Sequence, residues 1–200
     1  TNVATGGLVA TISLPPGGRY MAINHNFYGS KNRLSAYVVN GVGPAFEFDG
    51  TTVVPILSGM TVDTPVRVFE IANHLGLCFA GGSVQISSLG EPAIFNAITG
   101  ALEIGLGTEI TDVIQSSETA VVLFGAQKIG ILTGRDAASF QLDELTEEAG
   151  AEPWTAQRIG KTVYLDARGL RDLTATQSYG NFKAGLLSEI IEPYFRAKRM

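Results

Sequence analysis

Carboxylates are the side chains of this chain that could most readily do chemistry. The candidates fall in its middle part: Glu103, Glu109, Asp112, Asp143, Glu144, Glu147 and Glu148. The last four lie close enough in sequence to suggest an ion site, but their spacing does not match that of a calcium-binding loop. We therefore interpret 143–148 as a solvated acidic surface, with an ion site as the alternative.

Other reactive groups are sparse. Gly82-Ser83-Val84 lacks the second glycine of a nucleophile elbow. His25 and His74 are the only histidines, and neither forms a pair at metal-ligand spacing. Cys78, the single cysteine, lies in an apolar run, where we expect a small buried side chain. We expect no catalytic residue, no metal site and no cofactor, and hence no enzyme.

The composition is that of a globular, acidic protein. Of 200 residues, 45% are hydrophobic and 16% are charged, and the formal net charge is −5. This charge argues against a protein that binds nucleic acid by neutralising its phosphates. No apolar run reaches the length of a membrane span. The chain starts without Met and ends directly after a helical pattern, so we expect the natural protein to continue.

These residues must be positioned by a repeated unit. A short apolar run next to a glycine-containing turn occurs four times, with Leu34, Leu75, Val121 and Val163 as equivalent positions. The interval of roughly 40 to 50 residues is typical of a propeller blade. We therefore predict an all-β, propeller-like fold with about four blade units of antiparallel strands, forming one domain over 1–200 that could be incomplete.

Each unit is predicted to contain three or four strands. In the first two units we expect strands at 19–27, 34–40, 45–48 and 52–56, then at 66–71, 75–80 and 84–87. In the last two we expect them at 110–115, 120–124, 128–132 and 139–142, then at 155–159, 162–166 and 170–175. The second strand of each unit is apolar on both faces, which predicts a neighbour on each side.

Two other segments have their own patterns. The acidic stretch 142–150 is predicted to be a short helix that ends at Gly150, or a loop. The apolar run 7–14 is predicted to be a strand outside the four units. It would either complete the last blade and close a ring, or belong to a preceding blade.

The segment 183–198 is predicted to be a helix at the C-terminal end. Its apolar residues lie on one stripe at helical spacing: Leu187, Ile190, Ile191, Tyr194 and Phe195. Such a stripe either packs on its own domain or docks onto a neighbouring subunit.

Four segments together resemble a known family. They are 37–51, with the Asp49-Gly50 turn, then 77–92, 129–134 and 169–182. In this order they are similar to segments of the tail tube or nozzle proteins of short-tailed, podovirus-like bacteriophages. The resemblance implies a β-propeller structural protein of the virion, made in the bacterial cytoplasm. It also implies a homo-oligomeric ring, usually a hexamer, that conducts the genome during ejection and contacts adaptor, fibre or spike proteins.

The acidic residues gain a hypothetical role from this resemblance. Carboxylates that line a ring would repel DNA phosphates, so that a duplex passes without binding. Two alternatives stay open at this point. The chain could be a propeller that binds a glycan or a protein outside any virion, or a propeller hydrolase, although it lacks recognisable catalytic pairs.

Overall fold

The computed structural model describes residues 16–29 and 34–174, and these form four antiparallel sheets. Sheet 1 contains β1 (Met21–His25), β2 (Ser35–Val39), β3 (Ala45–Phe48) and β4 (Val53–Ile56). Sheet 2 contains β5 (Arg67–Ile71), β6 (His74–Cys78), β7 (Ser83–Ile86) and β8 (Leu102–Gly105). Sheet 3 contains β9 (Ile110–Ser117), β10 (Ala120–Gly125), β11 (Ile129–Thr133) and β12 (Gln141–Thr146). Sheet 4 contains β13 (Gln157–Ile159), β14 (Lys161–Asp166) and β15 (Gly169–Asp172).

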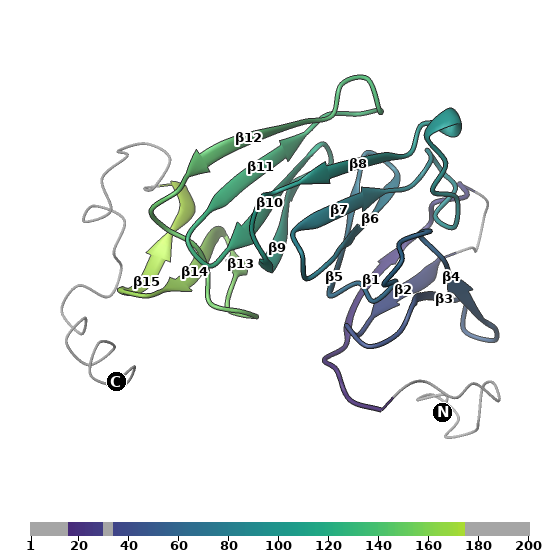
Figure 1. Cartoon of the computed structure of the whole chain (residues 1–200), viewed down its shortest axis with the longest axis horizontal. Helices are drawn as coiled ribbons and strands as arrows, with labels where there is room; N and C mark the ends of the chain where they lie inside the picture. The colour runs from purple at the N-terminus through teal and green to yellow at the C-terminus, as the bar shows by residue number, and fades with distance from the viewer. Residues whose placement is uncertain (1–15, 30–33, 175–200) are drawn as a thin grey trace.

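Within every sheet, the strands pair in the order in which they occur in the chain. The sheets themselves follow one another along the long axis of the molecule (Figure 1). The predicted all-β class and the four antiparallel units are thus confirmed. Short hairpins explain this order, because an antiparallel pair needs only a tight turn to connect its strands.

The predicted repeat located the second strand of each sheet, but one of its four equivalent positions was wrong. Leu75, Val121 and Val163 all lie in the second strand of their sheets and are buried. Leu34 precedes β2 and is 64% exposed, so its assignment as the equivalent residue was wrong. The alternation of β2 directs Tyr37 and Val39 inward instead.

Three hydrophobic clusters fill the spaces between successive sheets. Sheets 1 and 2 enclose one around Tyr37 and Leu77. Sheets 2 and 3 enclose a second around Ile86 and Leu123, and sheets 3 and 4 a third around Tyr164. Sheets 2 and 3 are consequently covered on both faces, as the apolar pattern of their second strands predicted.

The turn between β5 and β6 shows how local chemistry sets the hairpins. Ala72 and Asn73 both have positive φ, at 47° and 64°. A two-residue hairpin with a right-handed twist requires this conformation at both positions. The backbone N–H of Ala72 donates to the carbonyl of Glu118, 2.7 Å away, and this bond ties the turn to sheet 3.

Two sequence predictions need correction. The segment 142–150 is neither a helix nor simply a loop, because Gln141–Thr146 is the strand β12, paired with β11. Backbone pairing with a sheet edge outweighs the local preference of its acidic residues. The strand β8 was not predicted at all. It follows a long connection that contains the short 3-10 helix η1 (Ala97–Thr99).

The segments 7–14 and 183–198 lie outside the described residues, so the predicted strand and the predicted C-terminal helix stay predictions. Among the described residues, no helix has the length and apolar character needed to cross a membrane.

Candidate functional site

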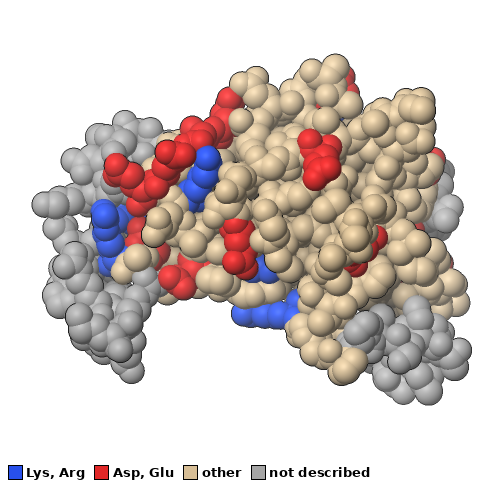
Figure 2. Space-filling model, in the orientation of Figure 1, with Lys and Arg blue, Asp and Glu red and all other residues tan. Residues whose placement is uncertain are grey.

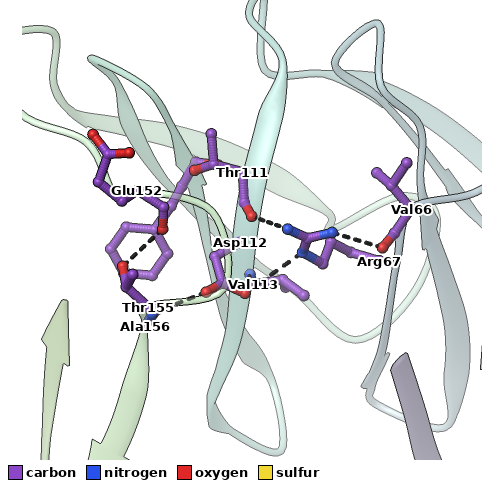
Figure 3. A network of polar contacts seen from close by, with 9 residues as sticks. Val66, Arg67, Thr111, Asp112, Val113, Glu152, Thr155 and Ala156 are labelled. Atoms are coloured by element: carbon purple, nitrogen blue, oxygen red, sulfur yellow. Dashed lines mark hydrogen bonds and ion pairs between the residues drawn. The ribbon is translucent and has the colours of Figure 1, made fainter. Parts of the chain in front are cut away.

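The most elaborate polar site joins sheets 2 and 3 through Arg67, the first residue of β5. Its guanidinium Nη1 donates to the carbonyl of Val66 at 2.8 Å, and Nη2 donates to the carbonyl of Thr111 (Figure 3). Its Nε lies 3.6 Å from Oδ1 of Asp112. Both side chains of this ion pair are almost fully buried, with exposed fractions of 5% and 7%.

Asp112 extends the site to sheet 4. Its Oδ1 accepts a hydrogen bond from the N–H of Val113 at 3.0 Å, and its Oδ2 accepts one from the N–H of Ala156 at 2.9 Å. Ala156 directly precedes β13. One buried carboxylate therefore connects the first strands of three successive sheets.

Trp154 brings sheet 1 into the same site. The guanidinium carbon of Arg67 lies 3.6 Å from the centroid of the indole ring, and that of Arg19 lies 4.3 Å away. Both distances suit a cation–π interaction. Arg19 leads into β1, so all four sheets meet here. We refer to Arg19, Arg67, Asp112 and Trp154 as the hub.

The electrostatics of the hub are those of a structural ion pair. Burial lowers the pKa of Arg67, while the neighbouring Asp112 opposes that change. Burial also raises the pKa of Asp112, and hydrogen bonds from Ala156 and Val113 together with the charge of Arg67 work against it. The polar contacts given above for Arg67 and Asp112 are all to other groups of the protein. The hub can therefore hold the sheets together.

A second network ties the opposite ends of the first strands. The carboxylate of Glu70 accepts from the N–H of Asn73 at 2.7 Å and from Nε2 of Gln115 at 2.5 Å. Oδ1 of Asn73 lies 3.0 Å from Nε2 of His25, and its Nδ2 donates to the carbonyl of Phe27. This network joins sheets 1, 2 and 3, and no pattern in the sequence predicted it.

The predicted acidic residues occupy four different environments. Asp112 is buried in the hub, so it cannot line an open lumen, and its place in that set was wrong. Glu103 is exposed on β8 and accepts a hydrogen bond from the hydroxyl of Ser83 at 2.7 Å. Glu109 is exposed in the connection between β8 and β9.

The remaining carboxylates form a row on the outermost strand of sheet 3. Asp143 and Glu144 lie on β12, and Glu147 and Glu148 follow it, all of them exposed. Figure 2 shows this acidic row along β12 with basic atoms beside it. We call these four residues the acidic rim. Charged side chains on an edge strand also prevent the pairing of exposed edges between molecules.

Lys128 interrupts the acidic rim. Its ammonium nitrogen lies 2.6 Å from Oε2 of Glu144 and 3.4 Å from Oε1 of Glu147. These contacts raise the pKa of Lys128, and the hydrogen bond from Lys128 lowers the pKa of Glu144. The rim is therefore a partly neutralised charged edge. The described residues contain no cluster of three or more metal-binding side chains.

The histidines and the cysteine have structural positions. His74 is buried, and its Nδ1 lies 2.7 Å from the carbonyl oxygen of Ser87. His25 contacts Asn73 as described above. Cys78 is a free, fully buried thiol, as predicted, and burial raises its pKa. A protonated, inaccessible thiol is a poor nucleophile.

Comparison with known proteins does not assign the chain to a family. No protein-family model matches the chain, and a search of curated proteins finds no match. The resemblance to phage tail proteins therefore stays a prediction that depends on the four sequence segments.

Proposed function

We propose that this chain is a structural protein of the tail of a short-tailed bacteriophage, in the tube or nozzle, with no catalytic role. It would assemble into a ring of identical subunits, by the family resemblance a hexamer. The ring would conduct the genome during ejection and anchor adaptor and fibre or spike proteins. The protein would thus be part of the virion after synthesis in the host cytoplasm.

One observation carries this proposal: the four sheets resemble successive blades of a propeller. In a propeller the first strands of the blades lie side by side near the axis, and the last strands lie at the periphery. Here β5 contacts both β1 and β9, while β8 and β12 form the opposite edges of sheets 2 and 3 from β5 and β9 (Figure 1). The described sheets would then be an arc of blades around the hub.

The charge pattern supports passage of DNA without binding. The chain has a net charge of −5, and the acidic rim and Glu109 are exposed. Tight binding to duplex DNA depends on basic groups that displace counterions from phosphates. A ring of acidic subunits would instead repel the duplex and leave it free to slide.

Electron microscopy of the purified protein, together with its measured mass, tests the assembly. We expect closed rings, with a mass that corresponds to several copies. A protein that stays monomeric at all accessible concentrations would contradict the proposal.

Filter binding to duplex DNA at low salt tests the charge argument. We expect negligible retention by the wild type, and more retention by assembled protein with Glu147→Lys and Glu148→Lys. Glu91→Lys is the control for a change in net charge, because Glu91 is exposed in the connection between β7 and β8 and lies outside the acidic rim. Tight duplex binding by the wild type would contradict an inert passage for DNA.

A further inference from the structure

Sheet 1 has one face that no other described sheet covers. Its residues form two rows that cross all four strands in register: Ala22, Val38, Phe46 and Pro55, then Asn24, Ala36, Phe48 and Val53. All of them except Asn24 are apolar, and all of them are exposed or partly exposed. None belongs to the three clusters between the sheets. We call this surface the open face.

The open face has the apolar composition of a sheet face that packs against another element. A sheet face that meets only water normally alternates to polar residues. The opposite face of sheet 1 contributes Tyr37, Val39 and Ile56 to the cluster shared with sheet 2, and these side chains are buried. Phe46 and Phe48 have the same character without a described neighbour across from them. Contiguous apolar patches of this kind mark interaction sites.

The chain itself contains a segment suited to this surface. The predicted helix 183–198 carries its apolar residues on one stripe, as given above, and its other positions include Lys183, Glu189 and Arg196. A helix with one apolar stripe must bury that stripe against another element. A flat apolar sheet face is such an element.

The length of the segment that connects β15 to the predicted helix favours a contact between two copies over a contact within one chain. The described residues end at Thr174, after β15 of sheet 4, and sheet 1 lies at the other end of the long axis (Figure 1). The nine Cα–Cα steps from Thr174 to Lys183 span at most roughly 32 Å when fully extended. Packed layers lie about 10 Å apart, so the outer two of four sheets are separated by about 30 Å, and a helix packed on the open face would lie about 40 Å from sheet 4.

We infer that the open face of sheet 1 binds the helix 183–198 of a second copy of this chain. Sheet 4 of one copy is then placed next to sheet 1 of the following copy. Such a head-to-tail contact uses two different surfaces, and it generates a ring when the rotation between copies closes. This inference rests on the proposed function and names the contact that would build its ring.

Cross-linking between differently tagged copies tests the contact directly. One co-expressed chain carries Val38→Cys and the other carries Ile191→Cys, with Cys78 left in place because it is buried. Mild oxidation is expected to give a disulfide-linked species that contains one copy of each tag. A cross-link found only within single chains that carry both substitutions would overturn the inference, and so would no cross-link in either arrangement.

Assembly measurements separate this inference from the proposed function. Phe48→Lys and Ile191→Lys are each expected to weaken self-association at least tenfold, with thermal unfolding used to check that each variant folds. Ile98→Lys is the matched control, because Ile98 is 93% exposed on η1 and belongs to neither row of the open face. Rings that form normally with Phe48→Lys and Ile191→Lys would overturn the inference and leave the proposed ring intact. A wild type that never associates would overturn both.

Discussion

Sheets 1 and 2 have the same topology but opposite exposure. All five residues of β6 in sheet 2 are buried, whereas β2 in sheet 1 alternates between buried and partly exposed residues. Both strands are the second of four in an antiparallel meander, and both are largely apolar. The difference arises because sheet 2 has a neighbour on each face, while sheet 1 has a described neighbour on one. The position of a sheet in the stack thus decides what its residues contribute to stability.

The largest effect is expected where sheet 2 is tied to sheet 3. Asp112→Ala leaves the guanidinium of Arg67 buried without its carboxylate, and breaking a buried ion pair costs about 3–5 kcal/mol. Urea unfolding followed by circular dichroism measures this loss. Asp143→Ala, on the exposed edge strand β12, is the matched control.

The double variant Arg67→Met with Asp112→Leu sharpens this test. Replacement of both charges by apolar groups is expected to recover much of the lost stability, because no charge is then left unpaired. An Asp112→Ala protein as stable as the wild type would contradict a structural role for the hub.

Core truncation compares the two sheets directly. Leu77→Ala in β6 is expected to lower the free energy of unfolding by about 2–5 kcal/mol, because Leu77 is fully buried between sheets 1 and 2. Val38→Ala on the open face is expected to cost less than about 1 kcal/mol in the monomer, since its side chain is already partly in water. Equal losses from the two substitutions, measured by chemical denaturation of monomeric protein, would show that the open face is covered within one chain.

A smaller effect is expected at Gly76 in the middle of β6. A Cβ atom at this position would lie 2.2 Å from Cζ of Phe69 in the adjacent strand. Gly76→Ala should therefore overpack the cluster between sheets 2 and 3, at a cost of about 1–3 kcal/mol.

Gly105→Ala in β8 is the matched control, because no atom lies within 4 Å of the corresponding Cβ. Phe69→Leu should relieve part of the loss from Gly76→Ala, and a double-mutant cycle in thermal unfolding measures this coupling. Additive effects of the two substitutions would argue against the contact.

The smallest effect is expected at the acidic rim. Lys128→Gln removes the ion pairs to Glu144 and Glu147, which are exposed and therefore screened by salt. Lys128 lowers the pKa of Glu144, so the advantage of the wild type over Lys128→Gln is present above the ordinary pKa of a glutamate. That advantage is lost as the pH falls through the lowered pKa of the folded state.

Thermal unfolding of both proteins between pH 3 and 7 measures this difference. A loss from Lys128→Gln that matches the loss from Asp112→Ala would remove the distinction between rim and hub.

The sequence predicted where the strands lie better than it predicted how they pair. Short apolar runs next to glycine turns located β2, β6, β10 and β14, because that pattern is local. The strand β12 was predicted at 139–142 and not through 146, because the acidic residues from Asp143 onward hide an edge position that only pairing with β11 reveals.

The hub could not be predicted for a related reason. Arg67, Asp112 and Trp154 are far apart in sequence, and each is unremarkable in its own segment. Only the stacking of sheets brings them together. Similarly, alternation shows that Val38 and Phe46 share a face, but it does not show what covers that face.

Cryo-electron microscopy of the assembled protein tests the central claim, that stacked sheets build a ring through the open face of sheet 1. The account predicts closed rings in which Val38, Phe46 and Phe48 of each copy are covered by the adjacent copy. Rings in which these side chains face solvent, or particles that contain one copy only, would contradict it.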